Sequence, residues 1–233
     1  MARRAEKEGA YGGTMGSPMP RWATFDCYGT LVDWNGGIRR ELARLWPDEN
    51  ADDLLRRYHR EEPDVEREHP TASYREVMAR VLARLGEVAP GEEDALARSL
   101  PEWEVFPEVP EALEEARRRG WRLAILSNTD RDLIEASKAR IGVPIDETVV
   151  ASEIGSYKPA RGHWEEFYAR TGADHARHVH VAQSIFHDIV PAQELGLPSV
   201  WINRLGEIAG TSPTRELPDL EALPDVLDEL VPA

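Results

Sequence analysis

Short apolar runs and amphipathic segments alternate through the second half of the chain. Apolar runs that predict strands lie at residues 22–25, 121–126, 148–151, 178–182 and 199–202. Segments with apolar residues at helical spacing lie at residues 111–119, 131–140, 162–171 and 190–195. Uniformly apolar strands separated by helices are typical of parallel sheets that are covered on both faces. The pattern therefore predicts an α/β fold, with a Rossmann-like parallel sheet and helices on both of its faces.

The stretch between the first two predicted strands has a different pattern. Apolar residues recur there at helical spacing from about residue 36 to residue 100, and no strand pattern interrupts them. A glycine pair at Gly36 and Gly37 precedes the stretch, and prolines between residues 101 and 110 follow it, which suggests two hinges. We therefore predict a flexible arm, a core in two pieces and an inserted helical cap. Their boundaries are 1–19 for the arm, 20–34 and 106–233 for the core, and 35–105 for the cap.

The charge balance excludes several kinds of partner. The 233 residues include 43 acidic and 28 basic ones, which gives a formal net charge of −15. Because such a surface repels nucleic acid and anionic membranes, we expect neither as a partner. No apolar run reaches the length of about 18 residues that a membrane span needs. The single cysteine, Cys27, fits a reducing compartment, so we expect a cytoplasmic protein.

Polar residues stand at four places after the predicted strands. Asp26 comes directly after the first strand, and Ser127 and Asn128 come directly after the second. Lys158 stands in the loop after the third strand, and Asp188 follows the fourth. Ligands of parallel α/β sheets bind at the carboxyl ends of the strands. We therefore expect two carboxylates, an ammonium and a hydroxyl to face one pocket at that edge.

These four sites resemble the sequence motifs of the haloacid dehalogenase superfamily. Residues 25–33 look like its first motif, residues 126–128 its second, residues 157–159 its third and residues 187–188 its fourth. The resemblance covers residues 22 to about 204. It implies a hydrolase with a Rossmann-like core and a helical cap, acting on a small anionic substrate. Members of the family often pair through their caps, so a homodimer is a further expectation.

The resemblance also implies a role for each motif residue. Asp26 would attack an electrophilic carbon or phosphorus and form a covalent intermediate. Lys158 would keep Asp26 ionised, and Asp188 would orient Lys158 or prepare the water that opens the ester. Ser127 and Asn128 would hold the carboxylate or phosphate of the substrate.

Tyr28 favours carbon–halogen cleavage over phosphate-ester cleavage. Superfamily phosphatases carry a second aspartate two positions after the nucleophile, where it protonates a departing alkoxide. Tyr28 stands at that position here, and a phenol with a reference pKa of about 10 is a poor acid near neutral pH. A halide is a weak base and leaves without a proton. The sequence Asp-x-Tyr-Gly-Thr, from Asp26 to Thr30, also resembles the L-2-haloacid dehalogenases, which need no cofactor or metal.

Two alternatives stay open. The first is a phosphatase in which Asp26, the carbonyl of Tyr28 and Asp188 would hold a magnesium ion. The second is a catalytically silent binding protein. The fourth motif gives both some weight, because Gln183 and Ile185 stand where the dehalogenases typically carry serine and asparagine.

Several more residues are assigned to the site as substrate-binding groups. Ser184 and His187 lie in the altered fourth motif, where His187 is our candidate for handling the hydrolytic water. Thr30 would cap the following segment or orient Asp26. The dehalogenases also use a cap arginine near the leaving halide, for which Arg56 or Arg57 has plausible spacing.

Structural roles compete with these assignments. Ser127 and Asn128, with Thr129 or Asp130, would also suit the N-terminal cap of the next helix. Asp26 alone would fit a turn, and Lys158 alone would fit an exposed loop.

Overall fold

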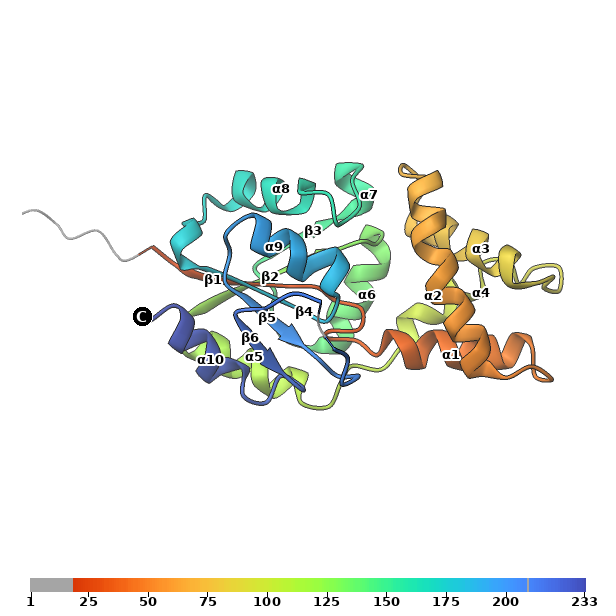
Figure 1. The fold of residues 1–233 in the computed structure, drawn as a ribbon, viewed down its shortest axis with the longest axis horizontal. Helices are drawn as coiled ribbons and strands as arrows, with labels where there is room; N and C mark the ends of the chain where they lie inside the picture. The colour runs from red at the N-terminus through yellow and green to blue at the C-terminus, as the bar shows by residue number, and fades with distance from the viewer. Residues whose placement is uncertain (1–18, 209) are drawn as a thin grey trace, which may run out of the picture.

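The structure is a computed structural model that describes residues 19–208 and 210–233, so the predicted arm lies outside the described residues except for Met19. Six parallel strands form one sheet in the order β3-β2-β1-β4-β5-β6 (Figure 1). They are β1 (Arg21–Phe25), β2 (Trp121–Ser127), β3 (Glu147–Val150), β4 (His178–Ala182), β5 (Ser199–Ile202) and β6 (Arg215–Leu217). The predicted parallel α/β sheet is confirmed.

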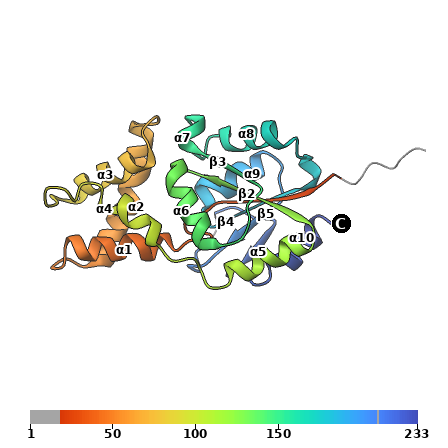
Figure 2. The same ribbon diagram turned by 180° about the vertical axis from the view of Figure 1, so that it is seen from behind.

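Alternate residues of the central strands enter two separate apolar layers. Ala23 and Phe25 of β1 pack in one layer with helices α5, α6 and α10. Trp22 packs in the other layer with α8 and α9, on the opposite face of the sheet (Figures 1 and 2). Because side chains alternate across a strand, a strand that is covered on both faces must be apolar at nearly every position. The helices around the sheet are α5 (Val109–Arg118), α6 (Arg131–Ile141), α7 (Ala151–Ile154), α8 (Gly162–Thr171), α9 (Val190–Glu194) and α10 (Leu223–Leu230).

Four helices between β1 and α5 stand beyond the carboxyl ends of the strands, and we call them the cap helices (Figures 1 and 2). They are α1 (Trp34–Leu45), α2 (Ala51–Glu68), α3 (Tyr74–Leu85) and α4 (Ala95–Ser99). The side chain of Asn50 accepts hydrogen bonds at the start of α2, and Ser73 forms a capping box with Glu76 at the start of α3. The exact boundary between cap and core stays a prediction.

Two chain segments connect the cap helices to the core, and they run side by side. Asp33 donates a backbone hydrogen bond to Glu104, at 2.7 Å, and Phe106 donates one to Leu31, at 3.1 Å. The two glycines predicted as a hinge lie instead in the first turn of α1. At Gly37 a side chain would overlap the Trp103 indole, so the glycine permits close packing.

Three short elements were missed by the sequence pattern. Strand β6 has three residues, none of them fully buried, at the edge of the sheet, so it has no apolar run. Helix α10 and the single turn of α7 were also missed. Three further turns complete the described elements: η1 (Leu100–Glu102), η2 (His175–Arg177) and the π-helical turn η3 (Ile185–Ile189).

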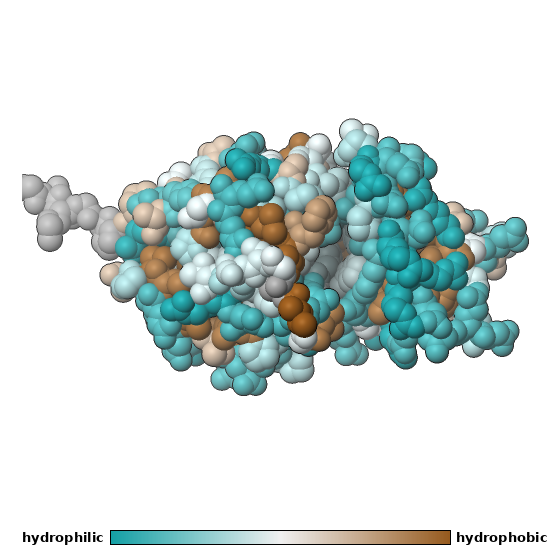
Figure 3. Space-filling model, in the orientation of Figure 1, coloured by the Kyte–Doolittle hydropathy of each residue, from teal (hydrophilic) through white to brown (hydrophobic). Residues whose placement is uncertain are grey.

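The surface of the cap helices is largely hydrophilic in the view of Figure 3, and the molecule is hollowed between them and the core. Across residues 19–208 and 210–233, no helix combines the length and the apolar character that crossing a membrane demands.

Candidate active site

Asp26 lies at the end of β1 and its carboxylate is held from both sides. Its backbone N–H donates to the Val181 carbonyl of β4, at 3.1 Å. The Thr30 hydroxyl donates to Asp26 Oδ2, at 3.0 Å, and accepts from the Gln183 N–H, at 2.9 Å. Gly29 has a φ of +90°, in the left-handed region that favours glycine, and turns the chain so that Thr30 comes back beneath Asp26. Thr30 therefore contacts the Asp26 carboxylate and is fully buried, away from the pocket wall.

Lys158 joins the two predicted catalytic carboxylates. Its Nζ donates to Asp26 Oδ1 at 2.9 Å, to Asp188 Oδ1 at 2.6 Å and to the Leu126 carbonyl at 2.9 Å. An ammonium has three donors, so all of them are used. The side chain is 1% exposed, and such a charge is tolerated in a protein interior only when it is paired.

The two carboxylates share this ammonium unequally. Burial raises the pKa of Asp188, but Lys158 and His180 outweigh it and hold that pKa well below its usual range. Burial also raises the pKa of Asp26, and there Lys158 offsets only part of the effect, so the pKa stays above that of an ordinary aspartate. The ammonium of Lys158 therefore stabilises the ionised form of Asp188 more than that of Asp26. The expectation that Lys158 favours the ionised form of Asp26 has the right direction, but burial is the larger effect.

Ser127 and Asn128 reach the same pocket and differ in what their side chains contact. The Ser127 hydroxyl is buried and has no hydrogen-bond partner in the described part of the chain, so it is free for a ligand. The Asn128 amide donates to the Lys158 carbonyl at 3.0 Å and accepts from the Lys158 N–H at 2.6 Å. Asn128 thus holds the loop that carries the lysine.

The structure gives no support to the capping role considered for these residues. Helix α6 begins after Asp130 without a side-chain hydrogen bond to its first turn. The Asp130 carboxylate instead accepts from the backbone N–H groups of Tyr74 and Arg75, both at 3.0 Å, at the start of cap helix α3.

The fourth motif folds into the π-helical turn η3. Ser184 precedes this turn, and its hydroxyl accepts from the His187 N–H at 3.1 Å and also contacts His187 Nδ1 at 3.1 Å. His187 Nε2 is buried without a hydrogen bond among the described residues. Burial lowers the pKa of His187 to about 4, so the ring is neutral near pH 7.

Tyr28 lines the pocket but its hydroxyl contacts Ser137 of α6, at 3.1 Å. Burial raises the pKa of Tyr28 well above its usual value. The phenol is therefore a weaker acid than in water, and its hydroxyl is already engaged by a serine of the core.

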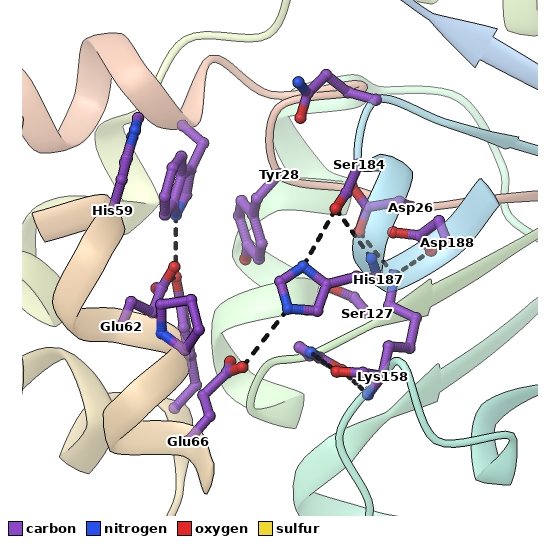
Figure 4. Close-up of a pocket in the computed structure, with 15 residues that line it drawn as sticks. Asp26, Tyr28, His59, Glu62, Glu66, Ser127, Lys158, Ser184, His187 and Asp188 are labelled. Carbon is purple, nitrogen blue, oxygen red and sulfur yellow. Dashed lines mark hydrogen bonds and ion pairs between the residues drawn. The ribbon is translucent and has the colours of Figure 1, made fainter. Parts of the chain in front are cut away.

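These residues line a cavity of about 210 Å³, smaller than the roughly 300–1,000 Å³ typical of sites for drug-sized ligands. The pocket suits a small molecule. Figure 4 shows residues of the core on one side of it and cap residues on the other. The cap contributes Trp34, His59, Glu62, Pro63, Glu66 and Tyr74.

Sequence reasoning missed all of these cap residues. Glu62 and Glu66 stand one turn apart on α2, with side chains that are largely buried. Burial raises the pKa of Glu62 to about 7, while the hydroxyls of Tyr74 and Tyr58 donate to its carboxylate and lower it. Burial, followed by the charge of Glu62, raises the pKa of Glu66 to about 9. A Glu-x-x-x-Glu spacing on an amphipathic helix is common on solvated faces, so the pattern alone carried no signal.

His180 is a further missed residue, and here the sequence held a signal. Its Nε2 contacts Asp188 Oδ1 at 3.0 Å, and its Nδ1 contacts the Thr24 hydroxyl at 2.8 Å. His180 therefore supports Asp188 from inside the sheet. Strand β4 has the sequence His-Val-His-Val-Ala, and histidines in a strand that is otherwise apolar are the anomaly that marks it.

The two cap arginines considered for the leaving halide do not reach the pocket. Arg56 is exposed and pairs with Asp53 on its own helix. Arg57 donates to the Leu85 carbonyl at 2.5 Å and approaches Glu49. Neither is among the pocket-lining residues.

Comparison with known proteins finds one family model, described as haloacid dehalogenase-like hydrolase, that matches residues 20–196. An (S)-2-haloacid dehalogenase of Pseudomonas sp. (strain YL) is 28% identical over 227 residues, which cover 88% of this chain and 93% of that protein. The (S)-2-haloacid dehalogenase 4A of Burkholderia cepacia is 25% identical over 221 residues, covering 91% and 94% of the two chains.

The fold is also similar to solved structures. The L-2-haloacid dehalogenase of Xanthobacter autotrophicus superposes with a TM-score of 0.76 at 20% identity, over 90% of this chain and 98% of that one. At this identity the similarity concerns the fold.

Proposed function

The chain belongs to the haloacid dehalogenase-like hydrolases, and from that premise we propose that it removes the halogen of a small 2-haloalkanoic acid by hydrolysis. The observation that carries the proposal is the Asp26 carboxylate at the pocket wall, paired with Lys158 at 2.9 Å. The hydroxyl of Tyr28 is engaged by Ser137, so no acid follows the nucleophile at the position that phosphatases use. The full-length similarity to (S)-2-haloacid dehalogenases supports the same reaction.

In the first step, an Asp26 oxygen attacks carbon 2 of the substrate from the side opposite the halide. A C–O bond forms, the carbon–halogen bond breaks, and the halide takes the electron pair. The unpartnered Ser127 hydroxyl is positioned to donate to the substrate carboxylate.

In the second step, water attacks the carbonyl carbon of the aspartyl ester and releases a 2-hydroxy acid. The pocket-lining polar residues that follow β4 are Gln183, Ser184, His187 and Asp188. His187 is neutral near pH 7 and accepts a hydrogen bond from the water, in the role expected for it. Asp188 keeps its charge and holds Lys158 in place.

The covalent intermediate provides the test. We expect that brief reaction with 2-chloropropionate, followed by acid quenching, adds the mass of the acyl group to the peptide that contains Asp26. Asp26→Asn should abolish the adduct and reduce chloride release by a factor of order 10³ or more. Asp33→Asn is a matched control, because Asp33 caps α1 and an asparagine caps as well. Undiminished chloride release by the Asp26→Asn variant, or no halide release by the wild type from any haloacid, contradicts the proposal.

A phosphatase is the second candidate, and one observation favours it. Asp188 Oδ2 is buried and has no hydrogen-bond partner in the described part of the chain, so it is free to meet a cation. Asp26 and Asp188 would hold a magnesium ion, which supplies charge stabilisation to phosphoryl oxygens. Magnesium-stimulated phosphate release from small phosphoesters, with no halide release, selects this candidate. Turnover of neither substrate class and no adduct on Asp26 select the silent binding protein.

A further inference from the structure

Buried polar groups of the two central strands lead from α8 to the candidate site. Thr24 of β1 stands beside His180 of β4 in the register of the two strands, and both are fully buried. His178, two positions earlier in β4, lies on the same face of the sheet and is also fully buried. Their surroundings are apolar, since the rings of Trp164 and Phe167 from α8 pack against the two histidines. Polar side chains in such a place need hydrogen-bond partners.

Each of these groups meets the next within hydrogen-bond distance. The Tyr168 hydroxyl lies 2.6 Å from His178 Nδ1, and His178 Nε2 lies 2.7 Å from the Thr24 hydroxyl. The Thr24 hydroxyl lies 2.8 Å from His180 Nδ1, and His180 Nε2 lies 3.0 Å from Asp188 Oδ1. We call this series from Tyr168 to Asp188 the histidine chain. All four ring nitrogens of its two histidines are engaged.

The carboxylate at the inner end decides the direction of these hydrogen bonds. The Asp188 carboxylate can only accept, so a His180 ring with one proton carries it on Nε2 and leaves Nδ1 as an acceptor. Thr24 then donates its single hydroxyl proton to His180 and accepts from Nε2 of His178. Nδ1 of His178 is left to accept from the Tyr168 hydroxyl. Because burial lowers the pKa of His178 well below its usual value and raises the pKa of Tyr168, a neutral ring and a protonated phenol fit this order.

Stability alone does not explain the histidine chain. Apolar residues would fill the same space without needing partners, and replacing both members of a buried hydrogen bond by apolar groups of the same shape can be neutral or stabilising. The chain instead fixes the side chain at its inner end. The donors from His180 and Lys158 both bond to Asp188 Oδ1, whereas Oδ2 has no hydrogen-bond partner in the described part of the chain. The carboxylate is thereby held in one orientation.

We propose that the members of the histidine chain outside the pocket are positioning residues for the hydrolysis of the aspartyl ester. These members are Tyr168, His178, Thr24 and His180, and none of them lines the pocket. The inference rests on the proposed dehalogenation. Before the first step, Asp26 and Asp188 both hold the Lys158 ammonium. After esterification Asp188 is the one carboxylate of the two that remains, so its orientation matters most in the second step.

The hydrogen bonds of the chain support one another. Each donor that also accepts a hydrogen bond is polarised by it, and such series are stronger than their isolated parts. Removing the Thr24 hydroxyl therefore weakens the hydrogen bond from His180 to Asp188, although Thr24 does not contact that carboxylate. The lysine beside the ester is then held less firmly, which slows hydrolysis more than it affects binding of the substrate.

Nitrogen NMR of the histidine rings tests the direction of the chain without substrate. We expect the wild type near pH 7 to carry the proton on Nε2 in both His178 and His180. Thr24→Val keeps the shape of the side chain but has no hydroxyl, so His178 Nε2 loses its acceptor. The His178 proton should then move to Nδ1, where the Tyr168 oxygen can accept it. Thr24→Ser restores a hydroxyl and should keep the proton on Nε2.

Kinetics with 2-chloropropionate tests the effect on the reaction. We expect Thr24→Val to lower kcat about fivefold or more, as the loss of one buried hydrogen bond would, without raising KM. Because hydrolysis is the slowed step, acid quenching during turnover should trap a larger fraction of Asp26 as the ester than in the wild type. Thr24→Ser should stay within about twofold of the wild-type kcat. Thr148→Val is the matched control and should also do so, since Thr148 is a buried threonine of β3 outside the histidine chain.

The outcomes separate this inference from the proposed function. A wild-type His180 with its proton on Nδ1 overturns the inference and leaves dehalogenation intact. Unchanged kcat in Thr24→Val, or equal losses in Thr24→Val and Thr24→Ser, has the same meaning. A wild type that releases no halide from any haloacid removes both.

A second variant covers the case in which Thr24→Val does not fold. Tyr168→Phe removes the first donor at the partly buried outer end of the chain. Thr24 still accepts from Nε2 of His178 there, so the His178 proton should stay on Nε2. Movement of that proton to Nδ1 in Tyr168→Phe contradicts the assigned direction.

Discussion

At the scale of the residue, burial decides how the charged groups of this pocket behave. Lys158 stays charged because two carboxylates surround it, although burial alone would lower its pKa. Glu66 has no such partner within hydrogen-bond distance, so burial and the negative Glu62 keep its proton bound. Burial therefore accompanies an ion pair on the core side of the pocket and a neutral acid on the cap side.

This contrast predicts a pH dependence of stability. The pKa of Glu66 is raised to about 9 in the folded protein, against about 4.3 for an unperturbed glutamate. Its proton thus contributes stability that is fully present below the unfolded pKa and is lost as the pH rises towards about 9. We expect the free energy of unfolding of the wild type to fall more steeply than that of Glu66→Gln between about pH 6 and pH 8, by up to about 1.4 kcal/mol per pH unit.

Urea unfolding at several pH values measures this difference. Glu61→Gln should follow the wild type, since its carboxylate is partly exposed and pairs with Arg84 on the surface. Parallel curves for the wild type and Glu66→Gln would show that Glu66 is ionised in the folded protein.

At the scale of the element, the strands could be predicted more closely than the helices around the pocket. β4 and β5 have the predicted bounds, because a strand covered on both faces must be apolar at nearly every position. Asp26 follows β1 directly, Ser127 ends β2, and Asp188 lies in η3 shortly after β4, so the sheet brings them to one edge. Glu66 could not be found in this way, since its place in the pocket depends on how α2 packs over the core.

Capping and close packing also depend on tertiary contacts that the sequence pattern lacks. Asp130 precedes α6 and would be expected to cap it, yet it bonds the start of α3, more than 50 positions earlier in the chain. Gly37 suggested a hinge, yet it lies where Trp103 approaches α1. In both cases the residue type fitted a local role, and a distant element determined the actual one.

The packing at Gly37 can be tested by adding one methyl group. Alanine favours helices over glycine by about 1 kcal/mol, so helix propensity alone predicts stabilisation by Gly37→Ala. The Trp103 indole stands where the new Cβ would lie, and we expect a net loss of about 1–3 kcal/mol in the free energy of unfolding instead. Gly210→Ala, where a Cβ would meet nothing within 4 Å, is the control. A stabilised Gly37→Ala variant would refute the packing argument.

At the scale of the whole molecule, the cap helices are fixed to the core beside the pocket. The Asp130 carboxylate of the core accepts both N–H groups at the start of α3, and the Tyr157 hydroxyl donates to the Ala72 carbonyl at 2.8 Å. These contacts are polar and come from the ends of elements. They lie beside an apolar cluster that cap and core share, to which Tyr74 of α3 and Leu133 of α6 both belong.

Asp130→Ala should loosen this junction. We expect amide hydrogen exchange at Tyr74 and Arg75 to become faster, with a loss of about 1–2 kcal/mol in the free energy of unfolding and a raised KM. Asp132→Ala removes only the exposed pair with Arg75 and should cost less than about 0.5 kcal/mol. Unchanged exchange at the start of α3 in Asp130→Ala would show that Ser73 alone secures the helix.

The position of Lys158 between two carboxylates has a consequence for the later half of the proposed reaction. Once Asp26 is esterified it carries no charge, and the ammonium then balances Asp188 alone. When Oδ2 forms the ester bond, Oδ1 becomes the carbonyl oxygen, and it stands 2.9 Å from Nζ in the free protein, so the oxyanion that forms on attack by water would meet a positive charge already in place. In the proposed reaction, Lys158 thus pairs with the Asp26 carboxylate first and later stabilises the oxyanion that forms during hydrolysis of the ester.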